Sequence, residues 1–262
     1  MKTVFRGPTS IRDFLNPINS GDTPLVELPE KLNPYYKDGV RIFMKLMFML
    51  PSGQIKSLAA YNMLNTEHVN GNTANIHTLV EASSGNTSYA LSTIGKTFGI
   101  ENTVAYVSHE ISKKKLQTLR LFGIQPEVFV DPLCADPSDS ESRIYKANKK
   151  GEEPGYLNLD QYSNTSNPEA HELITGPQIL RQLENNIAIC SAGLGTTGTI
   201  VGLSNVFKKN NLKTRIVAGV RSANNMVPGL RTMDLLREIR FDWKKILIQF
   251  TLSILLNLTK IA

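Results

Sequence analysis

Residues 187–209, IAICSAGLGTTGTIVGLSNVFKK, join a short apolar run to an amphipathic run through a turn rich in Gly and Thr. The apolar run Ile187–Cys190 predicts a strand, and Thr199–Lys209 predicts a helix. A turn between a strand and a helix gathers backbone N–H groups at the helix N-terminus, where the helix dipole favours an anion. Three glycines let the backbone approach such an anion closely. They are Gly193, Gly195 and Gly198.

The same alternation of strands and helices extends along much of the chain. Further strands are predicted at Ile76–Val80, Thr103–Val107, Glu127–Val130 and Arg215–Val220, and helices at Ala90–Phe98 and Ser112–Phe122, with Gly123 as a helix stop. This alternation implies parallel sheets with helices on both faces, so the predicted fold class is α/β. Residues 132–168 are rich in Asp, Ser, Asn, Pro and Gly and predict a long, functional connection.

Composition narrows the class of protein. The 262 residues are 41% hydrophobic and 20% charged, which is typical of a globular protein and excludes a disordered one. The net charge of +6 comes partly from lysine runs that lack interleaved aromatics, which favours solvated helix faces over a nucleic-acid partner. Cys134 and Cys190 are too few for a disulfide framework or a zinc site, so no metal is expected. The first residues lack a signal-like apolar stretch, and we expect a reduced, cytoplasmic protein.

The last segment, residues 246–262, reads ILIQFTLSILLNLTKIA. It is shorter than the roughly 20 apolar residues of a membrane span. Polar residues also interrupt it at Gln249, Ser253 and Asn257. We therefore expect a core-facing helix or a pair of strands and no membrane partner. A frameshifted tail is a further interpretation.

The Gly/Thr turn allows more than one ligand. Thr196, Thr197 and Thr199 add hydroxyl donors that suit a terminal phosphate monoester. The glycine spacing also matches the dinucleotide pattern G-x-G-x-x-G. A dinucleotide site needs a carboxylate at the end of the next strand, and Ala218–Arg221 offers none. A phosphate site is therefore favoured over a nicotinamide-dependent reductase, and a purely structural turn stays open.

A second polar segment, Glu81–Ser88, follows the predicted strand Ile76–Val80 and leads into a helix. Four of its side chains could form a nest for a carboxylate. They are Ser83, Ser84, Asn86 and Thr87. Simple capping of the helix is the alternative, although a cap needs only one such residue.

A third segment places Lys56 behind a Pro-Ser-Gly turn, at the start of a helical run Ser57–Leu64. The helix dipole disfavours a cation there, and this mismatch lowers the pKa of the ammonium group. A lysine that must react as a neutral amine needs such a shift. A single lysine in such a position is most often a surface residue, so this segment alone does not assign a function to Lys56.

In this order the segments resemble the cysteine synthase branch of fold-type II pyridoxal-phosphate enzymes, which also holds cystathionine β-synthase and 2,3-diaminopropionate synthases. The resemblance runs from about residue 10 to 245. The matching motifs are GDTPLV (21–26), KLMFMLPSGQIK (45–56), SSGNT (83–87), QYSNTSNPEAH (161–171), TGP (175–177) and GTTGT (195–199).

The resemblance implies a two-lobed, tryptophan synthase β-like fold. Residues 49–162 would form the smaller lobe, and 1–48 with 163–262 the larger, with its C-terminal part incomplete. It also implies a homodimer with pyridoxal 5'-phosphate as cofactor. The implied reaction is β-replacement on an O-activated serine in cysteine biosynthesis, such as O-acetylserine plus sulfide to cysteine, or a relative such as diaminopropionate synthase. The enzyme would be classed as a transferase or lyase with an amino-acid substrate.

The resemblance also assigns roles. Lys56 would bind the cofactor covalently and act as the acid and base at the substrate Cα. Asn86 would contact the cofactor's ring oxygen and the substrate. The α-carboxylate would be held by Ser83, Ser84, Thr87 and Gln161, and the phosphate by Gly195, Thr196, Thr197, Gly198 and Thr199.

Several positions depart from the family pattern. Ser57 and Leu58 are neutral where the family has charged residues, and Gln54 replaces a small Ser. Thr197 and Ser88 each replace a glycine. After Lys245 the resemblance stops. A truncated, catalytically inactive relative with a binding or regulatory role is therefore the alternative to an enzyme.

Overall fold

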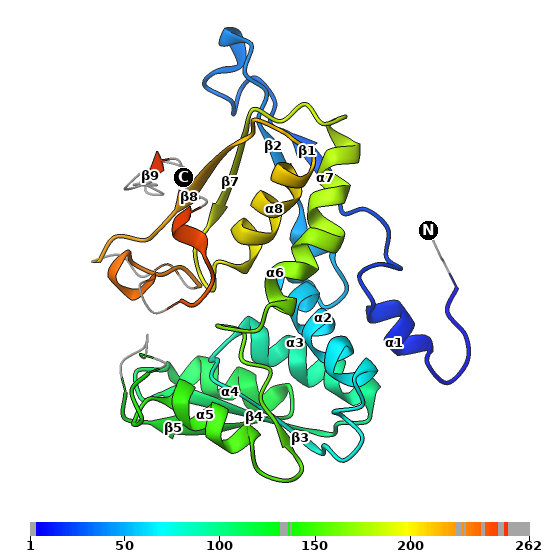
Figure 1. Cartoon of the computed structure of the whole chain (residues 1–262), viewed down its shortest axis with the longest axis vertical. Coiled ribbons are helices and arrows are strands. Elements are labelled where there is room, and N and C mark those ends of the chain that lie inside the picture. Colours follow the sequence, from blue (N-terminus) through cyan, green and yellow to red (C-terminus); the bar gives the residue numbers. More distant parts are fainter. Residues whose placement is uncertain are drawn as a thin grey trace.

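The computed structural model describes residues 4–131, 136, 138–223, 227, 229–236, 239–245 and 249–250. Within these residues the strands form three sheets, with the orders β1-β2, β5-β4-β3-β6 and β7-β8-β9 (Figure 1). All neighbouring strands in the two larger sheets are parallel. Parallel strands need crossover connections, and helices supply most of them here. The predicted α/β class is confirmed.

The four-stranded sheet is covered on both faces. Its strands are β3 (Thr78–Glu81), β4 (Asn102–Ser108), β5 (Ile124–Phe129) and β6 (Tyr156–Leu157), and its helices are α2 (Lys56–Val69), α3 (Asn86–Gly95), α4 (Lys113–Leu121) and α5 (Arg143–Gly151). Successive side chains of a strand point to opposite faces. Leu79 accordingly packs with side chains of α2 and α3, whereas Val80 packs with Ile144 of α5. In β4, Val107 packs with Leu119 of α4.

The three-stranded sheet consists of β7 (Ile189–Gly193), β8 (Arg215–Gly219) and β9 (Gln249–Phe250). Helix α8 (Gly198–Lys209) connects β7 to β8 and packs its apolar side chains against β8. Before them come α6 (Ser166–Ala170), a π-helical turn (His171–Thr175) and α7 (Gly176–Gln182). Helices α2 and α6 pack together between the two larger sheets (Figure 1).

The N-terminal part consists of α1 (Ser10–Leu15) and an antiparallel pair, β1 (Leu25–Glu27) and β2 (Phe43–Lys45). Short 3-10 turns cover Tyr36–Asp38, Met47–Met49, Lys96–Phe98, Asp234–Leu236 and Trp243–Lys245. Among the described residues, no helix combines the length and the apolar character needed to cross a membrane.

Most predicted elements lie where the sequence placed them, with ends shifted by a few residues. Gly123 follows Phe122, the C-cap residue of α4, and has a φ of +70°, as a helix stop requires. Strand β5 begins at Ile124, three residues earlier than predicted, because its pairing with β4 already starts there.

The prediction that residues 132–168 form one long connection is wrong. This stretch contains α5, β6 and the start of α6. Helix α5 begins after Ser142, whose hydroxyl accepts a hydrogen bond from the Tyr145 N–H. Ile144 and Ala147 are buried against the sheet, and Arg143 beside them is buried in an ion pair with Asp131 at 2.8 Å. These contacts hold a helix that is otherwise polar.

Two expectations are not decided by these elements. The tail was expected to form a core-facing helix or a pair of strands, but most of it, residues 246–248 and 251–262, lies outside the described residues. Cys134 also lies outside them. Of the tail, only Gln249–Phe250 is described, as the strand β9 beside β8. The division into lobes at residues 49 and 162 stays a prediction.

Candidate cofactor and substrate site

Lys56 is the first residue of α2 and is half-buried. Burial lowers the pKa of its ammonium group from 10.5 to about 8, the charge of Arg231 lowers it further, and the charge of Glu81 opposes the shift. The sequence predicted a lowered pKa from the helix dipole, but desolvation is the larger cause. The Lys56 Nζ donates a hydrogen bond to the Thr196 Oγ1 at 3.0 Å. This bond connects the predicted cofactor lysine directly to the Gly/Thr turn.

Asn167 connects the Gly/Thr turn to Gln161. Its side-chain nitrogen donates to the backbone oxygen of Gln161 at 2.8 Å and to the Thr196 Oγ1 at 3.2 Å. A backbone carbonyl can only accept, so the orientation of the Asn167 amide is fixed. The Thr196 oxygen accepts from both Lys56 and Asn167, which leaves its own proton free to be donated elsewhere.

Gln161 in turn connects to the polar segment after β3. Its side-chain oxygen accepts from the Thr87 hydroxyl at 2.7 Å, and its nitrogen donates to the Glu81 Oε1 at 3.2 Å. All three residues are buried. One hydrogen-bonded network therefore connects segments that are far apart in the sequence. It contains Lys56, Thr196, Asn167, Gln161 and Thr87, and it extends to Glu81.

Glu81 is a buried carboxyl group at the end of β3. Burial raises its pKa from 4.5 to about 8, with a further contribution from Asp160. The hydrogen bond from Gln161 and the charge of Lys56 act in the opposite direction. Its Oε2 has no hydrogen-bond partner, which agrees with a group that is neutral at pH 7.

Close contacts explain two glycines of the Gly/Thr turn. A Cβ at Gly195 would collide with the backbone oxygen of Gly229, and one at Gly198 would collide with the Asn167 side chain. Thr197 between them has a φ of +66°, in the left-handed region that costs a β-branched residue about 1–3 kcal/mol. Its side chain is buried, and its Oγ1 has no hydrogen-bond partner.

A histidine lies behind the same turn. The His171 Nε2 lies 3.1 Å from the Thr199 Oγ1, and its Nδ1 lies 3.0 Å from the Thr175 Oγ1. Burial, followed by the charge of Lys56, lowers the His171 pKa from 6.5 to about 3, so the ring is neutral near pH 7. A neutral imidazole has one donor and one acceptor nitrogen, and it therefore constrains the direction of the Thr199 proton.

Part of the predicted carboxylate nest lies outside the network. The Ser83 Oγ accepts from the Gly85 N–H at 3.4 Å, and the Ser83 backbone oxygen accepts from Ser88 at 2.8 Å. Ser88 therefore stabilises the loop in which it replaces a glycine. Asn86 is exposed and Ser84 is half-buried. Within the described part of the chain, no hydrogen bond connects either side chain to the network.

The neutral residues after Lys56 have structural partners. Leu58 is fully buried in a cluster with Leu50, Ala170 and Ile174, where a charged side chain would be desolvated. The Ser57 hydroxyl donates to the backbone oxygen of Gln54 at 2.6 Å. Packing thus accounts for Leu58, and a turn contact accounts for Ser57.

The sequence assigned no role to Glu81, Asn167 or His171. Glu81 had a signal, since it is a carboxylate that directly follows an apolar strand. Asn167 and His171 lie in the stretch 161–171, which was matched as a motif without separate roles for these two residues.

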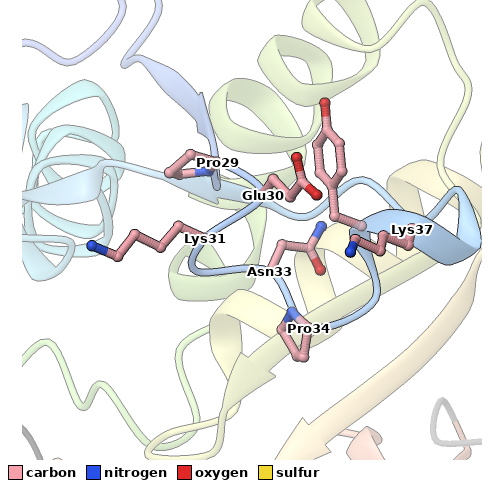
Figure 2. A pocket seen from close by; sticks show the side chains of 7 residues that line it. Pro29, Glu30, Lys31, Asn33, Pro34 and Lys37 are labelled. Atoms are coloured by element: carbon pink, nitrogen blue, oxygen red, sulfur yellow. The ribbon is translucent and has the colours of Figure 1, made fainter.

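A hollow lies apart from this network, in the loop between β1 and β2. It has a volume of about 710 Å³, and Figure 2 shows the side chains that line it. They are Pro29, Glu30, Lys31, Asn33, Pro34, Tyr36 and Lys37. All come from one loop, and none takes part in the network around Lys56.

The comparisons with known proteins agree with this geometry. The model of the family described as pyridoxal-phosphate dependent enzyme matches residues 18–237. The chain therefore belongs to the pyridoxal-phosphate dependent enzymes of fold type II, in the branch that holds cysteine synthases and cystathionine β-synthases.

Its curated relatives include cystathionine beta-synthase of Saccharomyces cerevisiae, 38% identical over 207 residues, which are 75% of this chain and 39% of the relative. Cysteine synthase of Staphylococcus aureus is 31% identical over 212 residues, 80% of this chain and 65% of the relative. Cysteine synthase B of Campylobacter jejuni is 33% identical over 209 residues, 78% and 64% of the two chains. The match thus spans about two fifths to two thirds of the length of these relatives.

Among solved structures, O-ureido-L-serine synthase superposes with a TM-score of 0.74 at 21% identity, covering 92% of this chain and 74% of the other. A hydrogen sulfide-producing enzyme from Fusobacterium nucleatum gives the same TM-score at 20% identity, covering 97% and 80%. At these identities the likeness shows the fold, which is the predicted two-lobed class with parallel sheets flanked by helices.

The family implies pyridoxal phosphate as cofactor. The residues present fit that group. A lysine with a lowered pKa can react with the cofactor's aldehyde, and it contacts a glycine-containing turn at the N-terminus of α8. The buried Thr197 hydroxyl of that turn is an unpaired donor, as an incoming phosphate requires.

Proposed function

We propose that the chain is a pyridoxal-phosphate-dependent β-replacement enzyme that acts on an O-activated serine. The single observation that carries this proposal is the hydrogen bond between Lys56 and Thr196. It brings the amine of Lys56 into contact with the Gly/Thr turn before α8, and this contact supports a shared cofactor site. Similarity to cysteine synthases supports O-acetylserine plus sulfide as the reaction, and diaminopropionate synthesis is a close variant.

When bound, pyridoxal phosphate supplies an electron sink for the bonds at the substrate Cα. Lys56 has two tasks in the proposed mechanism. As a neutral amine it would hold the cofactor, and it would also take the proton from the substrate Cα and later return it. A pKa near 8 suits both tasks, since the amine can then give and accept a proton near neutral pH.

We assign the cofactor's phosphate to Gly195–Thr199 and its ring oxygen to Asn86. Backbone N–H groups and the dipole of α8 favour a dianion at this turn. The Thr196 proton is free to be donated, because both acceptor positions of its oxygen are occupied by Lys56 and Asn167. Neutral His171 limits the orientations open to the Thr199 hydroxyl.

The substrate carboxylate would lie at the N-terminus of α3, among Ser83, Ser84, Asn86, Thr87 and Gln161. Thr87 donates its proton to Gln161 in this structure, so it cannot donate to a carboxylate at the same time. Gln161 retains one N–H beyond its bond to Glu81. We infer that this N–H and the loop hydroxyls Ser83 and Ser84 make the first contacts with the substrate.

In the proposed reaction the Cβ–O bond of O-acetylserine breaks and acetate leaves. A Cβ–S bond to sulfide then forms, and Lys56 returns the proton to Cα. The test is to supply pyridoxal phosphate, O-acetylserine and sulfide to the purified protein and to quantify cysteine and acetate. Equal amounts of both, abolished in Lys56→Ala, are expected. The proposed enzyme activity would be refuted if neither product formed and if other O-activated serines and amine nucleophiles also gave no product.

A second candidate is a binding protein that retains the cofactor fold without turnover. It is favoured by the engagement of both Gln161 side-chain atoms with Thr87 and Glu81. Such a protein would release no acetate when O-acetylserine is added. This holds whether or not O-acetylserine changes the absorbance of bound pyridoxal phosphate.

We also propose that the chain forms a homodimer. The antiparallel pair β1-β2 and the turn after it expose several large apolar side chains to solvent. They are Val26, Phe43, Met44, Phe48 and Met49. Contiguous exposed apolar side chains favour contact with another protein surface. Light scattering of the purified protein should give twice the mass of one chain, and a single-chain mass would contradict the proposal.

A further inference from the structure

Gln161 is held at both ends of its side-chain amide. Its oxygen accepts the Thr87 proton at 2.7 Å, and its nitrogen donates to the Glu81 Oε1 at 3.2 Å. This arrangement suits an ionised Glu81, because a carboxylate can only accept hydrogen bonds. It also engages the proton of the Thr87 hydroxyl, so that none is left for a substrate carboxylate at the N-terminus of α3.

Glu81 is mostly protonated at neutral pH. Burial raises its pKa to about 8, and the charge of Asp160 raises it further, against hydrogen bonds from Gln161 and the charge of Lys56. About nine in ten Glu81 side chains are therefore neutral at pH 7. Further charged or titratable groups in this region are Tyr162, Arg231 and the ion pair of Arg143 with Asp131.

A protonated Glu81 does not suit that arrangement. With Oε1 accepting from Gln161, the proton would be on Oε2, which is buried and has no hydrogen-bond partner in the described part of the chain. A buried donor without an acceptor is costly. If the Gln161 amide turns over, Oε1 carries the proton and donates it to the Gln161 oxygen, and only a carbonyl oxygen of Glu81 stays unpaired. The amide oxygen and nitrogen exchange places in this turn, and the outline of the side chain stays the same.

The reversed amide also changes the role of Thr87. The Gln161 nitrogen then faces the Thr87 Oγ1 and donates to it, so Thr87 keeps its own proton. Thr87 is the second residue of α3, where the helix dipole and the N–H groups of the first turn favour an anion. The proton is therefore released at the place that the proposed function gives to the substrate carboxylate.

We propose that Glu81 is a positioning residue that acts as a neutral acid: its proton reverses the Gln161 amide and thereby frees the Thr87 hydroxyl to bind the substrate carboxylate. The inference deepens the proposed function and rests on it, because it takes the carboxylate of an amino acid as the ligand. Glu81 itself does not touch the substrate. When Glu81 loses its proton, the Gln161 nitrogen turns back towards it, and Thr87 again donates to Gln161.

The probe is 3-acetoxypropionate, which is O-acetylserine without its amino group and has no amine that titrates. Its dissociation constant is measured by calorimetry at pH 7 and pH 9, on protein loaded with pyridoxal phosphate. In Glu81→Gln, the new amide can donate to Gln161 at both pH values. Thr87→Val lacks the hydroxyl, and Thr87→Ser keeps it. Lys56 also has a pKa of about 8, but it is present in every variant.

The wild type should bind the probe about five- to eightfold more weakly at pH 9 than at pH 7. The protonated fraction of Glu81 falls from about nine tenths to about one tenth, and a hydrogen bond to a charged group contributes about 10- to 100-fold in affinity. Glu81→Gln should change by less than about twofold between the two pH values. Thr87→Val should bind about 10- to 100-fold more weakly than the wild type at pH 7, with little further change at pH 9. Thr87→Ser should follow the wild type.

Three results would overturn the inference. One is a wild-type affinity that does not fall at pH 9, or no binding of the probe at pH 7. Another is an equal fall in the wild type and in Glu81→Gln, which would assign the pH dependence to another group. The third is a Thr87→Val variant that keeps the pH dependence of the wild type, which would mean that ionised Glu81 simply repels the ligand. If the wild type binds no pyridoxal phosphate, the proposed function fails and this inference fails with it. If it binds the cofactor and forms cysteine but gives one of the three results, only this inference fails.

Discussion

The lowered pKa of Lys56 predicts an unusual dependence of its reactivity on pH. With a pKa of about 8 instead of 10.5, about one Lys56 side chain in ten is neutral at pH 7, against roughly one in 3,000 for an ordinary lysine. The neutral fraction is therefore about 300-fold larger. Between pH 7 and pH 9 it should rise only about tenfold and then level off, whereas that of an ordinary lysine rises about 100-fold.

The assay is a brief pulse of an amine-acylating reagent at a series of pH values, followed by mass spectrometry of the Lys56 peptide. Lys45 is the matched control within the chain. Burial also lowers its pKa to about 8, but its Nζ contacts the Thr23 backbone oxygen and Gln182. Both lysines should show a plateau above pH 9. Labelling of Lys56 that keeps rising about tenfold per pH unit up to pH 10 would refute the reasoning.

The same shift has a consequence for stability. A base whose folded-state pKa is lowered destabilises the folded state at pH values below that pKa, and the cost disappears as the pH rises towards 10.5. Lys56→Met should therefore raise the free energy of unfolding at pH 7, by up to about 3 kcal/mol. The gain should vanish by about pH 10.5. Urea unfolding at both pH values measures it, and an equal gain at both would contradict the assignment.

Three further predictions follow from the site. Glu81→Gln should gain stability over the wild type as the pH rises from 4.5 to 8, by at most about 1.4 kcal/mol per pH unit, because a carboxyl group with a raised pKa costs stability in this window. Urea unfolding at pH 5 and pH 8 tests it, and a constant difference would count against a buried neutral acid. Gly195→Ala should lower the free energy of unfolding by about 1–3 kcal/mol, because the new Cβ would collide with the Gly229 backbone oxygen. Thermal unfolding tests this, and an unchanged melting temperature would contradict the contact. Gln161→Leu should raise the KM for O-acetylserine about tenfold or more while the affinity for pyridoxal phosphate stays within about 3-fold, and the reverse pattern would show that Gln161 serves the cofactor.

The sequence predicted the parallel α/β fold because its strands are short apolar runs between amphipathic helices. It failed at α5, whose apolar face has only Ile144 and Ala147 in a lysine-rich segment. Such a face is too narrow to show periodicity, and it becomes a helix because the sheet buries it. The start of β5 was missed for a related reason, since pairing with β4 rather than composition fixes it.

The sequence predicted the separate segments of the site, but it did not predict the hydrogen bonds that connect them. Lys56, the loop after β3 and the Gly/Thr turn each had a local signature. Their connections run through Asn167 and Gln161, and the bond from Gln161 to Glu81 crosses 80 positions of sequence. Tertiary placement also decides the pKa shifts, because burial depends on which elements pack around a residue.

The most direct test of the account is to find where pyridoxal phosphate attaches. The purified protein is mixed with the cofactor, reduced with borohydride, digested and mapped by mass spectrometry. The account predicts a stable pyridoxyl group on Lys56 and an unmodified Lys45, although the two amines have the same lowered pKa. No adduct, or an adduct on Lys45 in preference to Lys56, would contradict it.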